Sequence, residues 1–236
     1  AKHYGAKLKA VPGTLKEAIT DAIKTWITNP DYYYVCGSAV SSFPFPKIVQ
    51  FAQSIIGREI REQSMEQEGR LPDMICGCVG GGSNFIGSIH EFLDEPNIKK
   101  IGVEAAETAA LTHGTPNIMQ GMKSYMLASS DGSKSLGGSS LGAGIQYFGV
   151  GPQHSYLKDQ GAVTYTSATD KEILNAYKVV AQTEGISSAL EPMAAAAEVL
   201  KQAKGKPKDF IIVLSLCGRG EKDLDTIEEH MGKDFE

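Results

Sequence analysis

Three consecutive glycines, followed by a serine and an asparagine, are the residues in this sequence that most clearly indicate chemistry. The five residues are Gly80, Gly81, Gly82, Ser83 and Asn84. They follow an apolar run at 74–79 and precede a segment with helical spacing. Glycines let the backbone approach a ligand closely, and a helix start offers unpaired N–H groups with a partial positive charge. The pattern predicts a strand, a tight turn and a helix N-terminus that binds an anion, most often a phosphate.

Other types of glycine turn fit this run less well. It is not a Walker loop, because no Gly-Lys-Ser/Thr follows. It is a poor dinucleotide fingerprint, because the third glycine position falls on Phe85 or beyond. A plain strand-to-helix connection is the remaining alternative, although three glycines in a row cost conformational entropy. Binding of one phosphate through successive N–H groups fits better.

Strand-like and helix-like segments alternate on both sides of the glycine turn. The expected strands lie at 74–79, 100–105, 162–166 and 210–216, and the expected helices at 14–29, 43–70, 83–93, 169–185 and 192–203, with a last helix after 220. The run 210–216 is continuously apolar, which is typical of a strand buried on both faces. We therefore predict an α/β fold, with a parallel twisted sheet flanked by helices on both faces.

Two stretches depart from this alternation. Residues 1–5 resemble the last turn of a helix closed by a glycine, followed by a short strand at 7–11, so we expect further sequence upstream. The glycine-rich stretch 106–152 shows no regular pattern, and a segment of that length in a compact domain is usually functional or mobile.

Composition excludes several classes of protein. The chain has 236 residues, 42% hydrophobic and 22% charged, which is ordinary for a soluble globular protein. A formal charge of −5 without a basic stripe argues against nucleic acid as a partner. No apolar run is long enough to span a membrane, and no signal peptide opens the chain. Four cysteines, at 36, 76, 78 and 217, are too few for a disulfide framework, so we expect reduced, buried thiols in a cytoplasmic protein.

Four motifs of this sequence occur in the order and spacing of a known protein family. They are Val79-Gly-Gly-Gly-Ser-Asn84 with the upstream Glu68-Gly-Arg-Leu-Pro-Asp73, then Val150-Gly-Pro-Gln-His-Ser-Tyr156, Glu184-Gly-Ile with Ala189-Leu-Glu191, and Gly218-Arg-Gly-Glu-Lys-Asp223. In order and spacing they resemble the tryptophan synthase β family, which are pyridoxal-phosphate (PLP) enzymes of fold type II. The similarity runs from about Gly5 to the C-terminal helix.

The resemblance implies a set of cofactor-binding residues. Gly80, Gly81, Gly82, Ser83 and Asn84 would bind the phosphate of PLP, and Glu191 would lie beside its ring. From the residues alone, the preferred interpretation of Glu191 is a first-turn carboxylate favoured by the helix dipole. Cys217 stands where the family usually has a serine bonded to the ring nitrogen. Related serine dehydratases resemble this chain in having a cysteine at that position. A buried thiol at a strand end is the structural alternative for Cys217.

Three further positions match the family's substrate and cation sites. Gln146 falls where family members carry an aspartate that contacts the substrate and helps to close the enzyme, and an amide cannot make the same ion pair. Gly80, Tyr147 and Gly149 match positions whose backbone carbonyls hold a monovalent cation, sodium or potassium. Residues 106–152 resemble the mobile segment that communicates with the α subunit.

The family's Schiff-base lysine has no counterpart in this sequence. Family members place it, after a histidine, in an N-terminal part without a match here, and we interpret Lys123 as a solvated loop lysine. We therefore assign no catalytic residue and expect the chain alone to be inactive. We predict a remnant of the N-terminal domain at 1–52 and a PLP-phosphate-binding C-terminal domain at 53–236.

The resemblance implies β-replacement of the hydroxyl of L-serine by indole, giving L-tryptophan. It also implies an α-chain partner and a homodimeric parent protein. A serine or threonine dehydratase, indicated by Cys217, is one alternative. A non-catalytic module that binds a phosphorylated ligand or a partner chain is another.

Overall fold

The computed structural model describes residues 2–129 and 136–234, which form two compact units that divide between Cys36 and Gly37. The first unit contains the short 3-10 helix η1 (Lys2–Tyr4) and α1 (Leu15–Thr28). Thr14 and Glu17 form the expected capping box at the start of α1. The prediction of a strand at 7–11 was wrong, because these residues form no strand in the structure. A strand needs a paired neighbour, and sequence alternation alone does not supply one.

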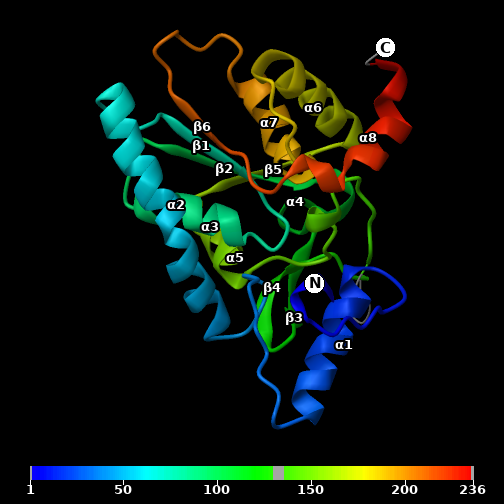
Figure 1. Cartoon of the computed structure of the whole chain (residues 1–236). Coiled ribbons are helices and arrows are strands. Elements are labelled where there is room, and N and C mark those ends of the chain that lie inside the picture. Colours follow the sequence, from blue (N-terminus) through cyan, green and yellow to red (C-terminus); the bar gives the residue numbers. More distant parts are fainter. Residues whose placement is uncertain (1, 130–135, 235–236) are drawn as a thin grey trace. The chain divides into compact units, whose positions relative to one another are not determined.

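A four-stranded parallel sheet is the centre of the second unit (Figure 1). Its strands, in spatial order, are β5 (Thr164–Ala168), β2 (Lys99–Ala105), β1 (Met74–Cys78) and β6 (Ile212–Ser215). The chain leaves β1 towards β2 and β5 on one side and returns to β6 on the other, so β1 lies at the point where the strand order reverses. In open parallel sheets, ligands bind beyond the carboxyl ends of the strands at such a point.

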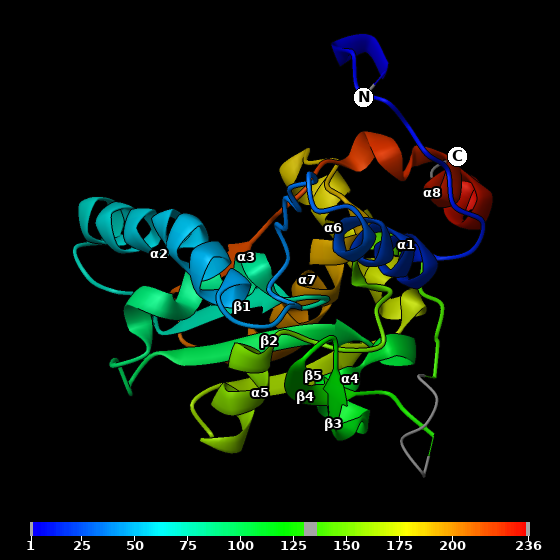
Figure 2. The ribbon, with the colours of Figure 1, turned by 90° about the horizontal axis from the view of Figure 1, so that it is seen from below.

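Helices cover both faces of this sheet, which confirms the predicted fold class (Figures 1 and 2). One face carries α2 (Phe45–Glu68), α3 (Ser83–Ile89) and α5 (Pro152–Asp159), and the other carries α6 (Asp170–Glu184) and α7 (Leu190–Gln202). Each face has its own apolar cluster, one around Phe85 and Phe92 and the other around Met193 and Ile173. The expected capping box of α6, made by Thr169 and Glu172, is present.

Strand β6 differs from its prediction. Its four residues are all half-buried, although the apolar run 210–216 predicted burial on both faces. The reason is its place at the edge of the sheet, where it has only β1 as a neighbour. After β6 the chain forms η5 (Gly220–Lys222), α8 (Leu224–Met231) and η6 (Gly232–Asp234).

The stretch 106–152 is more regular than expected where it is described. It contains η3 (Ala106–Thr108), α4 (Ala110–His113), the antiparallel hairpin of β3 (Thr115–Met119) and β4 (Met122–Met126), and η4 (Ala143–Ile145). The hairpin turns through Gln120 and Gly121, both with positive φ, and a Gln-Gly pair is a weaker sequence signal than Asn-Gly. The part of the predicted mobile segment at 130–135 lies outside the described residues.

The remaining expectations concern membranes and cysteines. Within the described ranges, no helix combines the length and the apolarity that crossing a bilayer requires. None of the four cysteines, which all lie in the described ranges, forms a disulfide. Cys76 and Cys78 are buried as expected, whereas Cys36 and Cys217 are partly exposed. The predicted domain division at 52/53 falls inside α2 and stays a prediction.

Candidate functional site

The predicted glycine turn connects β1 to α3. After β1, the N–H of Val79 still donates to the Val103 carbonyl at 2.8 Å, and the chain then turns through the glycines. Gly82 is the N-cap of α3 in the left-handed conformation, with φ 92° and ψ 13°. No side chain of the described residues caps this helix, so its first N–H groups lack the usual side-chain acceptor.

Two contacts orient the peptide groups of this turn. The N–H of Gly151 donates to the Gly81 carbonyl at 3.1 Å, and His154 Nε2 lies 2.7 Å from the Gly82 carbonyl oxygen. In a trans peptide the N–H points opposite to the C=O. With both carbonyls held on one side, the N–H groups of Gly82 and Ser83 face the other way. This gives a local row of donors suited to an anion.

The glycines of the turn are required sterically. A Cβ on Gly80 would lie 2.6 Å from the Gly144 carbonyl oxygen, and a Cβ on Gly82 would lie 2.2 Å from the His154 ring. Both distances are too short for a real side chain, and Gly82 also has a φ value that other residues rarely adopt. Tight packing against Gly144 and His154 thus accounts for glycine at positions 80 and 82.

His154 is a buried support of the turn. It is fully buried, and its Nδ1 lies 2.8 Å from the Tyr165 hydroxyl. Because the Gly82 carbonyl can only accept, Nε2 carries the ring proton and Nδ1 accepts from Tyr165. Burial lowers the pKa of His154 to about 4 despite its bond to Gly82, so the ring is neutral at pH 7.

A cavity of about 260 Å³ brings the separated sequence motifs together. Its lining comes from the glycine turn, the start of α7, the η4 segment and the loop after β6. The residues are Cys78, Gly80, Gly81, Gly82, Ser83, Asn84, Gly144, Ile145, Glu191, Cys217, Gly218 and Lys222. All seven predicted cofactor-binding residues are among them.

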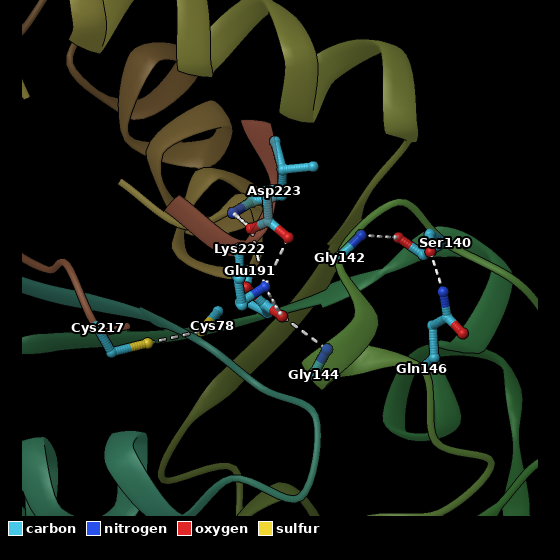
Figure 3. Close-up of polar contacts among 10 residues, drawn as sticks. Cys78, Ser140, Gly142, Gly144, Gln146, Glu191, Cys217, Lys222 and Asp223 are labelled. Atoms are coloured by element: carbon cyan, nitrogen blue, oxygen red, sulfur yellow. Dashed lines mark hydrogen bonds and ion pairs between the residues drawn. The ribbon is translucent and has the colours of Figure 1, made fainter. Parts of the chain in front are cut away.

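Glu191 is held in this cavity by two donors (Figure 3). Its Oε1 accepts from the Gly144 N–H at 2.6 Å and from Lys222 Nζ at 2.9 Å. Lys222 also contacts both carboxylate oxygens of Asp223, at 2.7 and 2.8 Å. Partial burial alone would lower the pKa of Lys222, but its bonds to Asp223 and Glu191 raise it above the ordinary value. Lys222 is therefore a fixed cation and not a free amine.

Two residues that line this cavity each have a buried oxygen without a partner among the described residues. These oxygens are Glu191 Oε2 and Asn84 Oδ1. A buried oxygen without a donor costs about 1–3 kcal/mol, and such atoms commonly mark a position where a ligand or water donates. Glu191 lies in the first turn of α7, and the protein uses only one of its two carboxylate oxygens.

Comparison with known proteins identifies the family. The family model described as pyridoxal-phosphate dependent enzyme matches residues 1–218. The chain belongs to this family. It is 46% identical over 243 residues to the tryptophan synthase beta chain of Allorhizobium ampelinum, covering 98% of this chain and 60% of the relative. It is 45% identical over 234 residues to the tryptophan synthase beta chain of Cereibacter sphaeroides, covering 94% and 57%. The chain thus spans about three fifths of the length of these curated relatives.

The predicted ring-nitrogen partner, Cys217, lies beside a second thiol. Its Sγ is 3.5 Å from Cys78 Sγ, and Cys78 Sγ lies 3.9 Å from the side-chain nitrogen of Asn84. Cys217 is thus not an isolated thiol at a strand end, because it belongs to a pair at the wall of the cavity.

The structure does not bring the other three predicted positions into the cavity lining. Gln146 donates from its side-chain amide to the Ser140 carbonyl, and Ser140 is bonded in turn to Asp170. Tyr147 is buried with its hydroxyl accepting from Gln120, and Gly149 bridges to Met126 beside the hairpin. The cation site at Gly80, Tyr147 and Gly149 stays a prediction. Within the described residues, no cluster of three His, Cys, Asp or Glu side chains could hold a metal ion.

Sequence reasoning missed three residues that support the candidate site. Lys222 and Asp223 belong to a motif that was recognised, but nothing in the sequence indicated that they fix Glu191. His154 also lies in a recognised motif, and its contact with Gly82 joins residues 72 positions apart. Lys123, interpreted as a loop lysine, lies instead on β4, where it is exposed as expected.

A pair of variants tests the support of the turn by His154. The side-chain nitrogen of glutamine can reach the place of Nε2, whereas that of asparagine reaches only the place of Nδ1. We expect His154→Asn to leave the Gly82 carbonyl without its side-chain donor and to shift the amide resonances of Ser83 and Asn84 strongly. His154→Gln should shift them less. ¹H–¹⁵N spectra measure this.

The same variants need a stability control. Each leaves one buried polar group unpaired, so both should lower the free energy of unfolding by about 1–3 kcal/mol in urea. Tyr165→Phe, which removes the partner of Nδ1 only, should resemble His154→Gln. Equal shifts of the turn amides in the Asn and Gln variants would contradict the assignment.

Proposed function

We propose that this chain forms the PLP-phosphate-binding part of an enzyme that replaces the hydroxyl of L-serine with indole to give L-tryptophan. The main support is one cavity that unites the glycine turn, Glu191 and Cys217. Relatives at 45–46% identity that carry the name tryptophan synthase beta chain support the reaction. The rest of the parent's properties are proposed with it: an α-chain partner, a homodimer, a monovalent cation and a cytoplasmic location.

The residues present fit PLP. The donors of the turn and the uncapped start of α3 suit a phosphate dianion. The unpaired Glu191 Oε2 and Asn84 Oδ1 suit groups that donate hydrogen bonds. Bound PLP supplies an electron sink for carbanion chemistry at the amino acid.

The protein's own residues would tune and orient this group. Glu191, fixed by Gly144 and Lys222 through one oxygen, would keep its second oxygen available to a donor of the bound group. Cys217 would stand at the ring nitrogen with a neutral or weakly donating sulfur, because a thiol is a poorer donor than a hydroxyl. Gln146, bonded to Ser140, would handle the substrate and closure without the charge of the family's aspartate.

A serine or threonine dehydratase is a second candidate, favoured by the sulfur at position 217. Both candidates share PLP and serine, but they differ in the fate of the substrate. The complete gene product that contains this chain, supplied with PLP, serine and indole, should form tryptophan faster than pyruvate. Pyruvate formation that indole does not suppress would favour the dehydratase.

A matched pair of glycine variants tests cofactor binding by this chain. Gly82→Ala should weaken PLP binding at least tenfold, because the new Cβ would clash with His154 and displace the turn. Gly69→Ala is the control: Gly69 is also left-handed, with φ 68°, but no atom lies within 4 Å of its Cβ position. Titration followed by PLP absorbance measures both, and inorganic phosphate should compete. Equal affinities of the two variants would argue against a phosphate at this turn.

We also predict that no lysine of this chain forms a covalent bond with PLP. Lys222 is held as a cation by Glu191 and Asp223, and Lys123 is an exposed strand residue. Incubation with PLP, reduction with borohydride and peptide mass spectrometry should yield only scattered, substoichiometric labelling. A stoichiometric adduct on one lysine of the 236 residues would overturn this prediction.

A further inference from the structure

Two thiols meet at the wall of the candidate site. Cys78 is the last residue of β1, and Cys217 follows the edge strand β6. The parallel register sets Gly77 opposite Ser215, so the chain ends beyond both strands lie next to each other. The two Sγ atoms are 3.5 Å apart, and both residues line the cavity (Figure 3).

The two thiols have different environments. Cys78 is 2% exposed, whereas Cys217 is only partly buried. The hydrogen bond between the thiols lowers the pKa of Cys217, and the charge of Lys222 acts in the same direction. The same bond, together with burial, raises the pKa of Cys78. Cys217 is thus the better nucleophile, with the Cys78 S–H as its donor.

We propose that Cys78 and Cys217 form an oxidation site that reacts with a small hydroperoxide and closes to a disulfide. We infer further that this disulfide weakens PLP binding. Only this second part rests on the proposed function, because the thiol chemistry needs no cofactor.

The reaction balances with one hydroperoxide as the oxidant. The Cys217 thiolate attacks one peroxide oxygen, the O–O bond breaks, and the departing oxygen takes a proton and leaves as water or an alcohol. Cys217 is then a sulfenic acid. Cys78 attacks that sulfur, the S–O bond breaks, and the hydroxide leaves as water with the proton of Cys78. Two thiols are oxidised by two electrons, and the hydroperoxide is reduced.

The geometry favours this closure over a single oxidised cysteine. A disulfide has an S–S distance of about 2.05 Å, so the sulfurs must approach by about 1.5 Å, a distance that side-chain rotation can cover. Closure removes both S–H groups and draws the Cys217 sulfur towards β1. The ring-nitrogen partner proposed above would then be displaced, and the Cys78 contact with Asn84 in the turn would change.

Mass spectrometry of the full chain tests the oxidation site. After hydrogen peroxide treatment and unfolding with an alkylating agent, the protein should carry two alkyl groups, on Cys36 and Cys76, where the reduced protein carries four. Peptide mapping should link Cys78 to Cys217. Dithiothreitol should reverse the change. Cys78→Ser and Cys217→Ser should not cross-link. The matched control is Cys76→Ser: Cys76 is buried on the same strand and bonded to the Ala195 carbonyl, and this variant should cross-link like wild type. Alkylation of both Cys78 and Cys217 after peroxide treatment would overturn the proposal.

PLP titration tests the consequence. We expect the oxidised wild type to bind PLP about tenfold more weakly than the reduced protein, with recovery after reduction. The affinity of Cys217→Ser, which lacks the thiol that attacks the peroxide, should not respond to peroxide. A cross-linked protein with unchanged PLP affinity would overturn the effect on binding. A reduced protein that does not bind PLP would instead refute the proposed function and this effect with it, while the mass measurement would still decide the oxidation site.

Discussion

Strands β1 and β6 run side by side in the same direction, with Met74 opposite Ile212 and Gly77 opposite Ser215. Because the pairing is parallel, the carboxyl ends of both strands lie next to each other. The glycine turn follows β1 there, and Cys217 follows β6. Helix α7 precedes β6 and begins beside these carboxyl ends, so Glu191 in its first turn lies in the same cavity lining. This pairing thus brings the glycine turn, Cys217 and Glu191 to one site.

The site also contains a carboxylate of which only one oxygen accepts hydrogen bonds from the described chain. Glu191 is a buried carboxylate with one oxygen bonded to Gly144 and Lys222 and the other without a partner in the described chain. A buried charge is tolerated when it is paired and hydrogen-bonded. The remaining oxygen is an acceptor already desolvated and fixed, and a ligand can use it without first ordering the side chain.

Close packing makes the turn rigid. Gly80 lies against the η4 segment and Gly82 against the ring of His154, so neither position has room for a side chain. The neutral His154 bridges the turn to Tyr165 on β5, at the far edge of the sheet from β6. The glycine turn after β1 is therefore supported from both sides of that strand. This support limits the conformations that the turn can adopt without a ligand.

The sequence by itself predicted the four strands of the parallel sheet, the helices α1, α2, α3, α6 and α7, and the glycine turn after β1, because these depend on local periodicity, capping and spacing. It predicted α6 from the Thr169 capping box and the turn from three glycines. Tertiary structure decided what local patterns cannot encode. The run 210–216 became a half-buried edge strand because the sheet ends there. Cys78 contacts Cys217, and Lys222 binds Glu191. Both contacts exist because parallel strand pairing brings together residues that are far apart in the chain.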